Sequence, residues 1–203
     1  MIKSIRHNLG NLTNFNGRDA RQTFWFWVLV VVIVQYAVSM LASVPMIISM
    51  SSGMISAITQ NPESVDATAQ AIDSVLDDML VWVKFQIIVG SIIGVISIGM
   101  LAASFVRRLH DGGFTGWIAV VPIAAYLFSL AYNIVVIDQV EEMMRASMAS
   151  GADGSAVADP FAMQAEMGVM GLVGWLAPLI GIIFGVWPSE EGPNQYGEEP
   201  DLH

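Results

Sequence analysis

Four long apolar stretches dominate the pattern of hydrophobic and polar positions along the chain. They cover residues 24–50, 80–105, 117–137 and 168–187, and none alternates as a half-buried strand does. A helix of about 20 apolar residues crosses the hydrocarbon core of a bilayer. The pattern therefore predicts an all-α protein, an integral membrane bundle of four transmembrane helices.

Polar segments flank and connect these spans. Residues 1–23 precede the membrane domain 24–187, and residues 188–203 form an acidic tail. The two long connections, 51–79 and 138–167, are rich in Asp and Glu and poor in Lys and Arg. We interpret them as solvated loops that contain helical extensions of the spans.

Each acidic connection carries its own helix signals. "NPES" at residues 61–64 places a capping Asn, a Pro at the first helical position and a Glu in the first turn. We expect a helix that begins there and runs into the second span. The other connection begins as a continuation of the third span, and the Gly- and Asp-containing stretch 150–160 predicts a break.

Composition supports a membrane protein and excludes several classes of function. Of the 203 residues, 55% are hydrophobic and 13% are charged, whereas soluble domains carry about 25% charged residues. The net charge of −10 argues against a nucleic-acid partner, because nucleic-acid binders present a basic face. The chain has no cysteine, so it has no disulfide, thiolate metal site or thiol nucleophile.

The basic residues predict the orientation. With four spans, the N-terminal segment and the short loop after the second span lie on one side of the membrane and hold six of the eight Lys and Arg residues. Because Lys and Arg concentrate in cytoplasmic segments, we expect both termini in the cytoplasm. A cleaved signal peptide is the alternative at the N-terminus, although the first apolar stretch is longer than a signal sequence requires.

The short loop after the second span has an unusual composition, "VRRLHDGGFTGW" at residues 106–117. Arg107 and Arg108 are favourable at the C-terminus of a helix, which we expect to end there. Gly112 and Gly113 allow the chain to reverse. This reading, a positively charged hairpin, gives no reason for the neighbouring His and Asp.

Three polar motifs follow one another along the chain: "NFNGRDARQTFWFW" at 14–27, "RRLHDGGFTGW" at 107–117 and "GPNQYGEEP" at 192–200. Together and in this order, they resemble the DUF805 family of bacterial inner-membrane proteins of unknown function. The resemblance implies this topology in the bacterial inner membrane, and it implies no activity. Both acidic connections are longer than expected of the family, and "EEGPN" replaces a shorter Gly-rich run.

The three motifs all fall on the predicted cytoplasmic side, so we expect them to meet. Arg18 or Arg107 would pair with Asp111 or Asp19, and the Tyr196 hydroxyl would cap the cluster. The cluster has three alternative roles: to lock the helix ends and the tail together, to bind an anionic head group or other phosphate, or to catalyse a reaction. The candidate ligand- or lipid-binding residues are Arg18, Arg107, Arg108, His110, Asp111, Asn194 and Tyr196.

Other patterns are weaker. Gly90 with Gly94, and Gly181 with Gly185, have the spacing that permits close helix packing, within the chain or in a homo-oligomer. A His next to an Asp, without a second spaced set of ligands, does not predict a metal site. We expect no metal and no cofactor.

These patterns predict a non-enzymatic scaffold or accessory subunit that binds membrane lipids or a protein partner. The alternative is a small transporter or channel component, but the spans lack a central charged group and offer only Gln35, Gln86, Ser97 and Asn133. A third hypothesis is a membrane enzyme that acts on a lipid phosphate, with His110 as the base.

Overall fold

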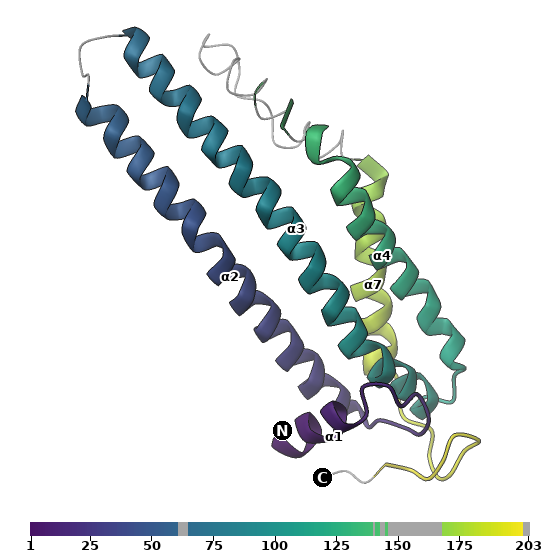
Figure 1. Cartoon of the computed structure of the whole chain (residues 1–203). Helices are drawn as coiled ribbons and strands as arrows, with labels where there is room; N and C mark the ends of the chain where they lie inside the picture. The colour runs from purple at the N-terminus through teal and green to yellow at the C-terminus, as the bar shows by residue number, and fades with distance from the viewer. Residues whose placement is uncertain (61–64, 140, 143–144, 146–167, 201–203) are drawn as a thin grey trace. The chain divides into compact units, whose positions relative to one another are not determined.

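The computed structural model describes residues 1–60, 65–139, 141–142, 145 and 168–200, and most of these residues are helical (Figure 1). The only strand-like pairing there is an isolated bridge between Asn194 and Gly197. The prediction of an all-α fold is confirmed. The elements are α1 (Ile2–Gly10), α2 (Arg21–Gln60), α3 (Val65–Asp111), the 3-10 helix η1 (Gly116–Ala119), α4 (Val120–Val135) and α7 (Gly168–Val186).

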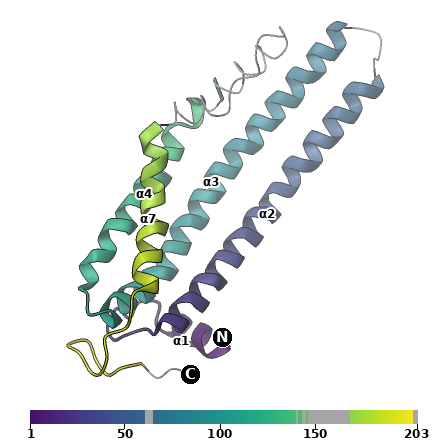
Figure 2. The same ribbon diagram turned by 180° about the vertical axis from the view of Figure 1, so that it is seen from behind.

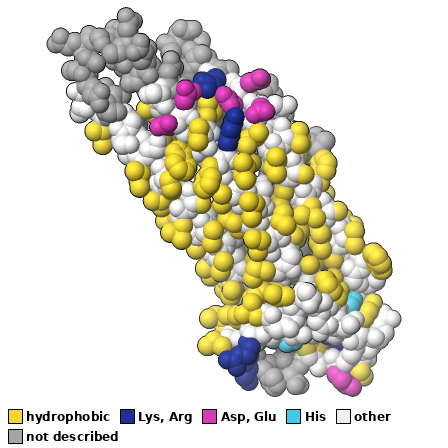
Figure 3. Space-filling view, in the orientation of Figure 1, with side chains coloured by type: hydrophobic (Ala, Val, Ile, Leu, Met, Phe, Trp, Pro, Cys, Tyr) yellow, Lys and Arg dark blue, Asp and Glu magenta, His cyan; other side chains and the backbone are white. Residues whose placement is uncertain are grey.

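Among the described residues, three helical segments are long and apolar enough to cross a membrane. They are Arg21–Gly53, Asp77–Asp111 and Gly116–Val135, and α7 adds the shorter apolar segment Val173–Val186. Only 11% of the most apolar window of the first segment is buried, and hydrophobic side chains cover much of the face shown in Figure 3. So much exposed apolar surface requires a lipid environment. The fold is that of a membrane bundle of about four helices.

Some helix ends differ from those expected. The helix of the second span ends at Asp111, beyond Arg107 and Arg108, because the chain leaves the helical conformation only at Gly113, which has φ +77°. Helix α2 continues past residue 50, and Ser51 and Ser52 donate their hydroxyls back to carbonyl groups of the same helix.

The helical extensions can be followed in part. Helix α3 runs without interruption from Val65 into the second span, as expected. The predicted start at 61–64 and the predicted break at 150–160 lie outside the described residues. A feature that the sequence did not predict is α1, a nine-residue helix within the N-terminal segment.

The chain divides into two compact units, which we describe separately. Unit 1 comprises Met1–Tyr36, Ile93–Tyr132 and Met167–His203. Its hydrophobic core is built from α2, α3 and η1, and partly buried residues of α7 pack against it. Two views show that α1, the start of α2, the end of α3 and the tail come together in this unit (Figures 1 and 2). The main hydrophobic cluster of this core has four buried residues, Phe24, Phe105, Leu109 and Ala119.

Unit 2 comprises Ala37–Ile92 and Asn133–Glu166. Within it, α2 and α3 approach closely at Gly53, where an added Cβ would lie 2.7 Å from Val75 Cγ2. The Ser49 hydroxyl also donates to Asp78 Oδ2 of α3, at 3.1 Å. The packing of unit 2 thus combines a small residue with polar contacts between helices.

Candidate functional site

The candidate site lies where α3 ends in unit 1. The Gly112 N–H donates to the carbonyls of Arg108 and Leu109, and the Phe114 N–H donates to the carbonyl of Leu109. The left-handed conformation of Gly113 then turns the chain toward η1. This tight ending fixes the backbone at the four preceding residues, so that their side chains project in defined directions.

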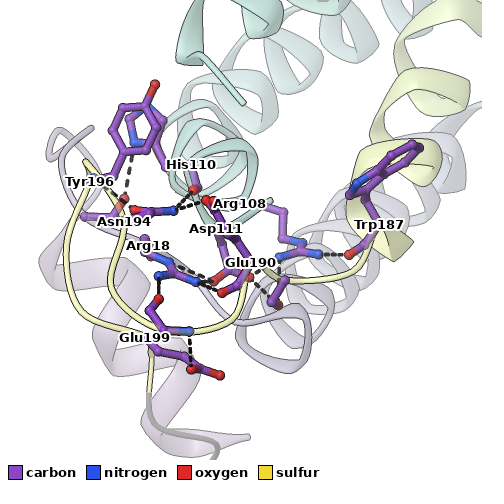
Figure 4. A network of polar contacts seen from close by, with 12 residues as sticks. Arg18, Arg108, His110, Asp111, Trp187, Glu190, Asn194, Tyr196 and Glu199 are labelled. Carbon is purple, nitrogen blue, oxygen red and sulfur yellow. Dashed lines mark hydrogen bonds and ion pairs between the residues drawn. The ribbon is translucent and has the colours of Figure 1, made fainter. Parts of the chain in front are cut away.

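Asp111 is the central acceptor of the site and is completely buried. Its Oδ1 accepts from Arg18 Nε at 3.1 Å, and its Oδ2 accepts from Arg108 Nη1 and from the Ser189 hydroxyl (Figure 4). Its backbone carbonyl accepts from the Glu190 N–H at 2.8 Å. One residue of α3 thereby contacts the N-terminal segment and the tail at once.

Arg18 and Arg108 also donate to backbone carbonyl oxygens. Arg18 Nη1 and Nη2 donate to the carbonyls of Gly192 and Glu190, each at 2.6 Å. Arg108 donates from Nε to the Gly185 carbonyl at 3.3 Å and from Nη2 to the Trp187 carbonyl. A guanidinium at the C-terminus of α7 satisfies carbonyls that have no partner within the helix, and the helix dipole favours its charge.

A second ion pair joins the N-terminal segment to α3. Arg107 Nη2 lies 3.1 Å from Asp19 Oδ2, and the same nitrogen donates to Asn8 Oδ1 at 2.7 Å. Asp19 also accepts from the Ser104 hydroxyl at 2.8 Å, and His7 Nε2 lies 3.0 Å from its other oxygen. Arg107 Nε is the one buried side-chain polar atom without a partner among the described residues.

The tail packs on this assembly through Asn194 and Tyr196. Asn194 Nδ2 donates to the His110 carbonyl at 3.0 Å and to Glu190 Oε2 at 2.9 Å. The Tyr196 ring stacks on the His110 ring, with centroids 3.7 Å apart and planes 3° from parallel. His110 Nδ1 lies 3.2 Å from the carbonyl of Gly17, so the histidine bridges the tail and the N-terminal segment.

The structure brings all seven predicted site residues together. We call this set, together with Asp19, the polar clamp: Arg18, Asp19, Arg107, Arg108, His110, Asp111, Asn194 and Tyr196. Tyr196 differs from expectation, since it contributes its ring face and its backbone N–H rather than its hydroxyl.

Several contributors were not predicted from the sequence. Asn8 and His7 reach the clamp from α1, and Ser104 and Ser189 supply hydroxyl donors. The sequence does contain a signal for Asn8, because the polar residues Ser4 and Asn8 have the i, i+4 spacing of one helix face. In the structure both are buried on that face of α1.

The polar clamp contains more buried arginines than buried aspartates. Three buried arginines face two buried aspartates. The surplus positive charge lies against backbone carbonyls of Glu190, Gly192, Gly185, Trp187 and Asn11, whose dipoles point their negative ends at it. The guanidinium groups are therefore engaged by the protein itself.

The predicted packing glycines have different surroundings. A Cβ added to Gly185 would lie 2.7 Å from Trp25 Cζ2 and 2.8 Å from Phe24 Cε1, and one added to Gly94 would lie 3.0 Å from Leu130 Cδ1. A Cβ added to Gly90 or Gly181 would meet no atom within 4 Å among the described residues. The structure thus shows one close approach for each predicted pair.

A different set of charges occupies unit 2. Lys84 Nζ lies 2.6 Å from Glu141 Oε2, and Arg145 Nη2 donates to Asp77 Oδ1 at 2.7 Å. Hydrogen bonds from Lys84 and Arg145 lower the pKa of Glu141 below its ordinary value of 4.5. All these side chains are at least partly exposed. No group of three or more His, Asp or Glu placed to hold a metal is found within the described part of the chain.

The fold and the site define a class: an all-helical membrane protein in which buried ion pairs join the N-terminal segment to the end of α3, and hydrogen bonds join the tail to both. The family model for proteins of unknown function named DUF805 matches residues 12–198. The chain belongs to this family. Comparisons with curated proteins and with solved structures give no match.

Proposed function

We propose that the protein is a non-enzymatic membrane scaffold or accessory subunit, in which the polar clamp holds the C-terminal tail folded for a protein partner. The supporting observation is Arg18, whose guanidinium links Asp111 to the carbonyls of Glu190 and Gly192. Ordering a chain costs conformational entropy, and several part-buried hydrogen bonds offset that cost for the tail. A tail held in one conformation presents one fixed surface to a partner.

Among the alternative roles of the cluster, the geometry favours a lock over a phosphate-binding site. An arginine that binds a lipid phosphate needs free donors, whereas those of Arg18 and Arg108 are directed at internal oxygens. A phosphate would have to displace these hydrogen bonds. The partner-binding form of the proposal therefore has more support than lipid binding through these arginines.

The folded tail offers a surface with a definite chemical character. Glu191, Gln195 and Glu198 are exposed, while Asn194 and Tyr196 anchor the segment between them. A surface of this kind complements a basic segment of another protein.

The proposal includes a location. We place the protein in the bacterial inner membrane with several spans and with both termini in the cytoplasm, which is supported by the six basic residues on that side against two on the other. A reporter fused after His203 should be active in the cytoplasm. Activity in the periplasm only would overturn this orientation.

Photocrosslinking tests the proposed function. A photoreactive residue replacing Gln195 should yield a discrete adduct with a protein in native membranes. The adduct should be lost in Arg18→Ala, which releases the tail, and retained in the control Arg145→Ala, which removes an exposed charge from unit 2. An adduct that is unchanged in Arg18→Ala would contradict the proposal, as would flux of an ion or solute through the purified chain in liposomes.

A further inference from the structure

The two buried residues of α1 are polar, whereas two of its three apolar side chains are exposed. Ser4 and Asn8 face inward, where Asn8 accepts from Arg107 Nη2 and donates to the Ser4 carbonyl. Ile2 and Leu9 are 73% and 53% exposed. A helix that faced only water would show the reverse arrangement. The outward face of α1 therefore suits an environment less polar than bulk water.

Basic side chains lie beside this apolar face. Lys3 and Arg6 are exposed on α1, and Arg21 is exposed at the start of α2. Figure 3 shows basic side chains next to hydrophobic ones in the region of α1. No ion pair involves these three residues among those the structure describes. Apolar side chains with adjacent free cations are characteristic of helices that bind anionic lipid surfaces.

The attachment of α1 places it beside the ends of two apolar helices. His7 lies 3.0 Å from Asp19, and Arg107 Nη1 donates to the Asn11 carbonyl at 2.9 Å. Arg21 is the first residue of one candidate membrane span, and Asp111 is the last residue of another. A helix held at this level lies where lipid head groups surround the spans, so the bilayer itself is the occupant that fits its outward face.

The geometry points to α1 as an interfacial helix that docks on anionic lipid. Ile2 and Leu9 enter the boundary between head groups and acyl chains, and Lys3 and Arg6 contact the phosphates. The inference is independent of any partner of the tail, and it uses basic residues outside the polar clamp.

The test uses the full chain in nanodiscs of phosphatidylcholine, with or without phosphatidylglycerol. The chain has no cysteine, so Leu9→Cys can carry a single fluorescent label, and Thr13→Cys in the following loop is the matched control. With phosphatidylglycerol present, the Leu9 label should be quenched by lipids that carry a spin label near the head group and protected from aqueous iodide. The Thr13 label should remain open to iodide.

Charge variants separate lipid docking from simple burial. Lys3→Gln with Arg6→Gln should lower the ratio of docked to undocked α1 by about fivefold for each charge removed, while Lys3→Arg with Arg6→Lys should leave it unchanged. A Leu9 label open to iodide in anionic nanodiscs would overturn the inference. Protection without quenching by lipid would also overturn it, because protein rather than lipid would then cover the helix.

Discussion

The two units both contain ion pairs, but they differ in how far those ion pairs are exposed. In unit 1, the arginine–aspartate pairs of the polar clamp have side chains no more than 3% exposed. In unit 2, the ion-paired side chains are 29–85% exposed. Water screens the second set, whereas the first set is desolvated and must be fully compensated. The comparison teaches that burial, rather than the number of ion pairs, indicates which charges the fold depends on.

Removing the carboxylate of Asp111 should give the largest difference in stability between the two units. Asp111→Asn leaves Arg18 and Arg108 buried without a counter-charge, and we expect a loss of about 3–5 kcal/mol in the free energy of unfolding. The control is Asp138→Asn in unit 2, whose aspartate is exposed and lies 3.5 Å from Lys84. Unfolding in mixed micelles by SDS titration measures both variants. Equal losses would show that burial does not distinguish the two regions.

A second change tests whether the tight packing of unit 1 extends beyond its charges. Gly185→Ala would place a Cβ against the rings of Trp25 and Phe24, and we expect a destabilisation of about 1–3 kcal/mol. Gly181→Ala, one turn earlier on α7, meets no described atom within 4 Å and should be neutral. The same SDS titration compares them. Similar midpoints for the two variants would mean that the aromatic rings move aside at little cost.

Much of this architecture follows from the sequence, because backbone N–H and C=O groups in lipid must form hydrogen bonds within the protein. Apolar stretches long enough to span a bilayer must be helical, and their order places the motifs around Arg18, Asp111 and Asn194 on one side. That reasoning was sufficient to predict a meeting of the three motifs. It left the pairing open, because Arg18 and Arg107 carry the same charge and either could reach either aspartate.

The pairing depends on backbone geometry that sequence patterns do not encode. The Asp19 N–H donates to the Arg107 carbonyl at 3.1 Å, which sets Asp19 beside Arg107 and leaves Asp111 to Arg18 and Arg108.

Helix α1 is not predictable from the sequence pattern for a related reason. It has nine residues and no side-chain N-cap, and such short helices are marginal alone. Tertiary contacts such as that of Asn8 with Arg107 stabilise it.

The smallest effect we predict is the pH dependence of one ion-paired carboxyl group in unit 2. Hydrogen bonds from Lys84 and then Arg145 lower the pKa of Glu141 in the folded protein below its ordinary 4.5. A carboxyl whose folded pKa is depressed stabilises the fold above its unfolded pKa, and the contribution is lost as pH falls through the folded pKa. The difference in SDS midpoint between wild type and Glu141→Gln should be small, because water and salt screen the exposed ion pair. It should be constant above pH 4.5 and should shrink below that pH as Glu141 is protonated. A difference that grows on acidification would have the wrong sign for this ion pair, and one as large as that of Asp111→Asn would remove the contrast between the two units.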